Sequence, residues 1–146
     1  MNAAAYLHAS ALVVGEKGVL VRGPSGAGKS RLVAALKNAA EVGGRFARLI
    51  GDDRIALDVK GGRVVAAGHP AVTGLIERRG LGLCRGAALS PAVIGHVVDL
   101  VPESPRLPET ADETIWLEGV ELPYLQIDRR LSGSDQAALV LFWLFG

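Results

Sequence analysis

Apolar residues along the chain form short runs that stop at glycine, proline or charged residues. The length of these runs and their content of valine, leucine and isoleucine are typical of strands. Glycine-containing turns at 15–18 and 60–62 separate neighbouring runs, which predicts two hairpins. In the first half of the chain we therefore predict strands at 6–14, 19–21, 46–51, 54–59 and 63–67.

Two stretches have the pattern of helices instead. Residues 31–37 repeat apolar positions with helical spacing, and Gly43-Gly44 marks the end of that helix. The second helix is predicted at 135–145, where Ser132 or Ser134 can cap its first turn. Its C-terminal end is apolar and must pack against the domain or a partner subunit, so we expect a homo-oligomer.

In the second half of the chain, the pattern of apolar residues predicts fewer strands. We expect them at 92–101, 114–117 and 123–127, with Trp116 packed in the core. Prolines interrupt the segment 102–112, which is predicted to be a loop.

The segment Gly23-Pro24-Ser25-Gly26-Ala27-Gly28-Lys29-Ser30 lies between the strand at 19–21 and the helix at 31–37. It has the G-x-x-x-x-G-K-S spacing of a phosphate-binding loop, in the strand–loop–helix context that this motif requires. Glycines let the backbone wrap around phosphate, and the loop N–H groups and helix N-terminus then point at the anion. Lys29 can bridge the β- and γ-phosphates of ATP, and the Ser30 hydroxyl can bind Mg²⁺.

Asp52 and Asp53 follow directly after the apolar strand at 46–51. In phosphate-loop proteins, acidic residues at the end of a neighbouring strand serve as Mg²⁺ ligands and as bases. We therefore predict that this pair contributes to the site. The alternative is a simple turn, because aspartate begins turns readily.

Three further places carry candidate residues. The hairpin brings His8, at the far end of the first strand, near the phosphate loop, although a lone histidine is more often structural. Within 74–83, charges stand beside glycines, so a loop there could bring Glu77 to a metal and Arg78 or Arg79 to phosphate. A solvated charged face is the alternative.

Composition limits the class of protein. The chain has 146 residues, of which 49% are hydrophobic, and this predicts a single globular domain over 1–146. The net charge of +1 argues against nucleic acid as the main partner. A lone cysteine, Cys84, allows no internal disulfide and fits the cytoplasm. The apolar run at 137–145 is too short to span a membrane, and the first residues lack the features of a secretory signal.

Together these motifs resemble the catalytic domain of the HPr kinase/phosphorylase family. The resemblance rests on His8 followed by 18–30, on Gly51-Asp52-Asp53-Arg54-Ile55, and on 76–82, which is similar to the signature Glu-Ile-Arg-Gly-Leu-Gly. Weaker matches lie at 106–107 and 128–131, so the likeness runs from His8 to Leu131.

The resemblance implies an α/β phosphate-loop (P-loop) domain related to phosphoenolpyruvate carboxykinase, with a mixed β-sheet and flanking helices. It also implies an activity, the ATP- and Mg²⁺-dependent phosphorylation of a serine on the phosphocarrier protein HPr, with the reverse phosphorolysis. Such an enzyme is a serine kinase, a phosphotransferase that regulates a phosphotransferase system.

The same resemblance implies roles for individual residues. Asp53 would take the serine proton and, in reverse, protonate the leaving oxygen. Lys29 would neutralise the transferring phosphoryl group, His8 would lie beside it, and Arg106 would stabilise the charge of the transition state.

The metal site and the reverse reaction are implied in the same way. Ser30 and Glu77 would hold Mg²⁺ with the assistance of Asp52. Arg129 would lie in the loop that the family needs for dephosphorylation.

The sequence also departs from the family pattern. Ala9 stands where the family has a glycine, and Arg78 stands in place of the isoleucine of the signature. We expect a short form without the family's N-terminal domain and without most of its C-terminal helices. Two other functions stay open: a kinase of a small molecule such as free serine, and a nucleotide-binding regulator with little catalysis.

Overall fold

The computed structural model describes residues 6–69, 75–78, 82–85, 89–103 and 113–146, and of 75–78 and 82–85 it describes the backbone alone. In chain order its elements are β1 (Ala9–Val14), β2 (Lys17–Arg22), α1 (Lys29–Val42), β3 (Ala47–Gly51), β4 (Ile55–Lys60), β5 (Arg63–Gly68), β6 (Leu75–Arg78), β7 (Gly82–Arg85), β8 (Ala92–Ile94), β9 (His96–Val101), β10 (Thr114–Leu117), β11 (Val120–Asp128) and α2 (Gly133–Phe145).

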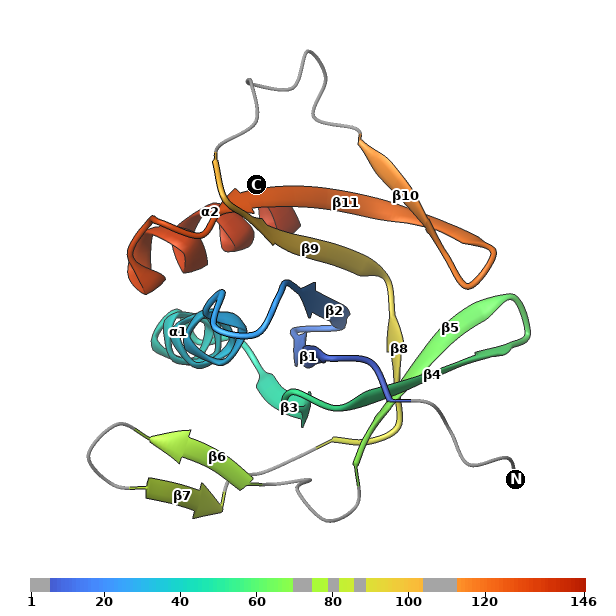
Figure 1. Ribbon diagram of the computed structural model, residues 1–146, viewed down its shortest axis with the longest axis horizontal. Coiled ribbons are helices and arrows are strands. Elements are labelled where there is room, and N and C mark those ends of the chain that lie inside the picture. Colours follow the sequence, from blue (N-terminus) through green and yellow to red (C-terminus); the bar gives the residue numbers. More distant parts are fainter. Residues whose placement is uncertain (1–5, 70–74, 79–81, 86–88, 104–112) are drawn as a thin grey trace.

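A six-stranded sheet forms the centre of the molecule, in the order β10-β11-β9-β2-β1-β3. Strand β9 runs parallel to both β2 and β11, whereas β1 pairs antiparallel with β2 and β3. The helices α1 and α2 lie on one side of this sheet, and β4, β5 and β8 lie on the other (Figure 1). The prediction of an α/β fold with a mixed sheet and flanking helices is confirmed.

Strand β2 shows how the two sides are built. Val19 and Val21 pack in a buried cluster with Leu32 and Leu36 of α1. Leu20, between them, points to the opposite face and belongs to a second cluster with the smaller sheet. Successive side chains of a strand alternate between faces, so a strand covered on both sides is apolar at every position.

Both predicted hairpins are present. The first pairs β1 with β2 from Ala9↔Arg22 to Val14↔Lys17. The second pairs β4 with β5, and its tip is Gly61-Gly62. Both tip residues have positive φ, 58° and 76°, as tight two-residue hairpin turns require.

The single strand predicted at 92–101 is wrong. This segment forms β8, which pairs with β5 in a three-stranded sheet, and β9, which pairs with β2 in the central sheet. Gly95 lies between them and donates its N–H to the Gly18 carbonyl, with an N···O distance of 2.9 Å. The chain changes sheets here, and both halves are apolar because both lie against a core.

Two further expectations need correction. Trp116 is 68% exposed, because the alternation along β10 turns the neighbouring Leu117 into the core instead. The stretch 74–83, for which the functional interpretation was a loop, contains β6 and the start of β7, and these strands pair from Leu75↔Arg85 to Arg78↔Gly82.

The C-terminal helix begins at Gly133, two residues before the predicted start, and its cap is Ser132, one of the two predicted candidates. The Ser132 hydroxyl accepts a hydrogen bond from the Asp135 N–H at 3.1 Å and so caps α2. Val140 and Leu144 pack into the core beside α1, whereas Phe142 on the outer face is 73% exposed. Among the described residues, no helix is long and apolar enough to cross a membrane.

Candidate active site

The phosphate-binding loop joins the end of β2 to the start of α1, as predicted. Gly26 and Gly28 take left-handed conformations, with φ of 82° and 99°. Gly28 caps α1 without a side-chain hydrogen bond, and the first turn of the helix carries no acidic residue. The positive end of the helix dipole and its free N–H groups are therefore available to an anion.

Lys29 is folded back into the loop. Its side chain is only 5% exposed. Its ammonium donates to the Gly23 carbonyl at 2.9 Å and to the Pro24 carbonyl at 3.3 Å. The same nitrogen lies 4.0 Å from Oδ1 of Asp53. The lysine thus stands between the loop and the second aspartate.

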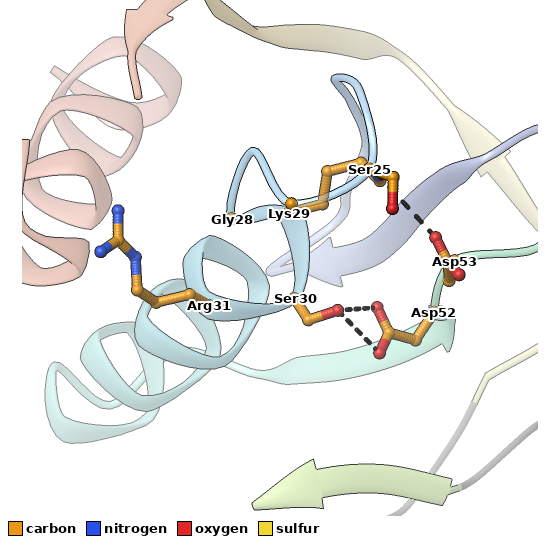
Figure 2. A pocket seen from close by; sticks show the side chains of 8 residues that line it. Ser25, Gly28, Lys29, Ser30, Arg31, Asp52 and Asp53 are labelled. Carbon is orange, nitrogen blue, oxygen red and sulfur yellow. Dashed lines mark hydrogen bonds and ion pairs between the residues drawn. The ribbon is translucent and has the colours of Figure 1, made fainter. Parts of the chain in front are cut away.

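Asp52 lies opposite the first turn of α1, at the end of β3 (Figure 2). The Ser30 hydroxyl donates to its carboxylate, with distances of 2.8 Å to Oδ1 and 3.0 Å to Oδ2. A hydroxyl and a carboxylate side by side are the oxygen donors that Mg²⁺ prefers. Ser30 and Asp52 are therefore residues that could hold a magnesium ion beside the phosphate-binding loop.

Asp53 adopts a left-handed backbone conformation with φ of 64°, uncommon for a residue other than glycine. Its side chain is 61% exposed and faces His8, whose Nδ1 lies 3.7 Å from its Oδ1. The structure therefore brings together His8, Lys29 and Asp53, as the sequence suggested.

Lys29 and Asp53 line a cavity of about 380 Å³, a size suited to a small-molecule ligand. Its lining consists of Ser25, Gly26, Gly28, Lys29, Ser30, Arg31, Asp52 and Asp53. Of the loop residues assigned to phosphate binding, Gly23, Pro24 and Ala27 are not among them. Gly23 instead packs tightly, because an added Cβ would lie 3.2 Å from Ala27 Cβ and 3.3 Å from Leu100 Cβ.

Arg31 points away from the two aspartates (Figure 2). It donates to the carbonyl oxygens of Arg129 and Leu131 at 3.3 Å and 3.1 Å. The turn that contains Arg129 is thereby tied to the first turn of α1. Within this turn, the Asp128 carboxylate is bound by Arg130, at 2.7 Å.

The remaining predicted residues are only partly described. Glu77 and Arg78 lie on β6, but their side chains are outside the described part of the structure. Arg79 and Arg106 lie outside the described residues altogether. In the described part of the chain, no three His, Cys, Asp or Glu side chains gather as a metal site.

Sequence reasoning missed Ser10. This residue of β1 is fully buried, and its hydroxyl donates to Asp52 Oδ1 at 2.7 Å. The Ser10 hydroxyl oxygen also accepts a hydrogen bond from the Asp53 N–H, at 3.1 Å. The available signal was a hydroxyl inside an otherwise apolar strand.

It also missed a polar cluster beside the loop. Arg22, the last residue of β2, binds Asp99 through two hydrogen bonds of 2.7 Å and 2.8 Å. The Tyr124 hydroxyl donates to the same carboxylate at 2.6 Å. The hydrogen bond with Asp99 raises the pKa of Arg22, and burial together with the bond to Asp99 raises the pKa of Tyr124 to about 12.

Comparison with known proteins shows that the chain is similar in sequence to a curated protein. A curated protein from Mycoplasma mycoides subsp. mycoides, named HPr kinase/phosphorylase, is 38% identical over 133 residues. The chain is homologous to the HPr kinase/phosphorylases. The match covers 82% of the chain but only 41% of the relative, so the chain spans less than half of that protein. The family resemblance inferred from the motifs is thereby confirmed. No protein-family model matches the chain.

A solved structure supports the fold. The Hpr(Ser) kinase/phosphatase from Coxiella burnetii superposes with a TM-score of 0.75, covering 96% of this chain and 93% of that one. The two sequences are 23% identical, so this likeness concerns the fold alone.

Proposed function

We propose that residues 1–146 form a single catalytic domain that transfers the γ-phosphoryl group of ATP to a serine of HPr. The same site would catalyse the reverse phosphorolysis, as in the family that the chain resembles. The observation that carries the proposal is the convergence of Lys29, Asp53 and the Ser30–Asp52 pair on one cavity beside the phosphate-binding loop.

In the proposed step, Asp53 accepts the proton of the serine hydroxyl as its oxygen bonds to the γ-phosphorus. The bond between that phosphorus and the bridging oxygen of ADP breaks. Lys29 moves from the loop carbonyls to the transferring phosphoryl group and neutralises its charge. His8, within 3.7 Å of Asp53, would lie beside that group.

Ser30, Asp52 and Glu77 would hold Mg²⁺, which supplies charge neutralisation at the phosphate oxygens. Arg106 would stabilise the transition state, and Arg129 would act in the reverse reaction. The tie between Arg31 and the carbonyl of Arg129 supports a position of that turn near the loop.

The exposure of the base favours a protein acceptor over a small molecule. Asp53 has a side chain that is 61% exposed, so a serine on the surface of another protein can reach it. An acceptor as small as free serine calls for an enclosed pocket, which would bury the base.

The test is transfer of label from γ-labelled ATP with Mg²⁺ to purified HPr, with free serine and no acceptor in parallel. We expect label on a serine of HPr. Asp53→Asn should abolish transfer and spare nucleotide binding, because it removes the base and leaves the loop intact. Lys29→Ala should abolish transfer and also weaken ATP binding.

Other outcomes are equally clear. Label on free serine alone would make the protein a small-molecule kinase. Nucleotide binding without label on any acceptor would make it a regulator. Normal transfer by Asp53→Asn would exclude Asp53 as the base.

A further inference from the structure

Ser10 is a polar residue enclosed in an apolar environment. Its neighbours on β1, Ala9 and Ala11, are buried core residues, and Ser10 itself has no exposed surface. A buried hydroxyl is unfavourable unless it is hydrogen-bonded. Among the described residues, the Ser10 hydroxyl forms its two hydrogen bonds with the aspartate pair, one to the Asp52 carboxylate and one from the Asp53 N–H.

The pairing of β1 with β3 explains why these groups meet. Leu12 pairs with Leu49, but Ala11 pairs with Gly51, so Ile50 is an extra residue in β3. Such a bulge changes the face to which the following side chains point. One step beyond the Ala11↔Gly51 pair, Asp52 comes to lie opposite Ser10.

Ser10 lies on the same face as the phosphate-binding loop. It shares the alternation of β1 with Leu12 and Val14, which pack against the helices. The Asp52 carboxylate therefore receives Ser10 from the strand and Ser30 from α1. Asp53, held by its N–H, keeps the left-handed turn that directs its carboxylate toward Lys29 and His8.

We propose that Ser10 is a positioning residue, whose hydroxyl sets the orientation of the magnesium ligand Asp52 and the backbone conformation of the base Asp53. This inference rests on the proposed phosphoryl transfer and adds a residue to its site. Ser10 acts through the two aspartates and is not a catalytic residue. Hydrogen bonds to charged groups are stronger than neutral ones, and partners that orient a metal ligand typically contribute about 10- to 100-fold to metal affinity or activity.

The experiment compares Ser10→Ala with the wild-type chain in two assays. In the first, a fluorescent nucleotide is titrated with excess Mg²⁺ and with chelator. We expect Ser10→Ala to bind the metal-free nucleotide normally and to lose about 10-fold or more of the tightening that Mg²⁺ provides. In the second, transfer to HPr should show kcat lowered by about 10- to 100-fold.

Two variants make the test specific. Val13→Ala also truncates a buried side chain of β1, but Val13 packs in the cluster on the opposite face of the sheet from Ser10, so this variant should lower stability and leave the effect of Mg²⁺ unchanged. Ser10→Cys keeps the approximate shape with a much weaker hydrogen-bond donor and should reproduce the Ser10→Ala defect, even if the alanine variant folds poorly.

The results separate the two hypotheses. Mg²⁺-dependent nucleotide binding without label on HPr would reject the proposed function, while the binding assay still tests Ser10. A wild-type effect of Mg²⁺ in Ser10→Ala or Ser10→Cys would overturn the role of Ser10. So would an equal loss in Val13→Ala, or a wild-type chain whose nucleotide binding ignores Mg²⁺.

Discussion

At the scale of single residues, Asp99 joins two strands through its side chain. It accepts hydrogen bonds from Arg22 on β2 and from Tyr124 on β11, which lie on either side of β9. Arg22 directly precedes Gly23, so the cluster holds the strand end from which the phosphate-binding loop departs. A partly buried charge pair of this kind is costly to break, because removal of one member leaves the other without its partner.

The raised pKa of Tyr124 predicts that the stability of the folded chain depends on pH in the alkaline range. Its pKa is about 12 in the folded chain and about 10 when unfolded, so its contribution to stability is complete below pH 10. That contribution is lost as the pH rises toward 12. We expect denaturant unfolding to show a smaller loss of stability over this range in Tyr124→Phe than in the wild type. Equal slopes for the two proteins would contradict the assignment.

At the scale of elements, the end of β3 depends on a close approach of two backbones. A Cβ added at Gly51 would lie 2.7 Å from the Gly68 Cα and 2.8 Å from Ile55 Cδ1. Gly51 immediately precedes the two aspartates, so the small sheet and the site are built on the same contact. Only a residue without a side chain allows β3 and β5 to come this close.

Gly51→Ala should therefore lower the free energy of unfolding by about 1–3 kcal/mol, because the Gly68 backbone cannot yield as a side chain can. Gly95→Ala is the matched control, since a Cβ there meets no atom within 4 Å. Urea denaturation of the two variants measures the difference. If both lost the same stability, the close approach would not be what requires glycine at this position.

At the scale of the whole molecule, the central sheet is covered on both faces, and α2 closes one of them. His96 at the start of β9 meets Trp143 of α2 edge to face, with ring centroids 5.2 Å apart. Its Nδ1 is buried and has no hydrogen-bond partner among the described residues. Burial, with a smaller effect of Lys17, lowers the pKa of His96.

The contact between sheet and helix should weaken in acid. The unfolded chain binds a proton at His96 more readily than the folded chain does. The contribution of neutral His96 to the stability of the folded chain is therefore complete above pH 6.5 and is lost as the pH falls below that value. We expect His96→Phe to lose less stability than the wild type between pH 7 and pH 5. Tyr124→Phe removes a group that titrates only at alkaline pH, so its loss of stability between pH 7 and pH 5 should equal that of the wild type. An equal loss in all three proteins would contradict the prediction.

The features that the sequence determined by itself are local ones. The spacing from Gly23 to Ser30 establishes the loop, because its glycines and its helix start are neighbours in the chain. Turn residues between adjacent apolar runs predict the hairpins. The position of the aspartate pair directly after a strand predicts that it belongs to the site. None of these inferences needs knowledge of a distant partner.

Only the tertiary structure decided which distant residues meet. Ser10 and Asp52 are 42 positions apart, and Arg22 and Asp99 are 77 apart, so no local pattern connects them. The division of 92–101 between two sheets was hidden because both halves are apolar, and Trp116 was misplaced because aromatic residues are usual in cores. The hydrophobic pattern predicts which residues of an element are buried. The register of the strands and the bulge at Ile50 determine which side chains share a face of the sheet.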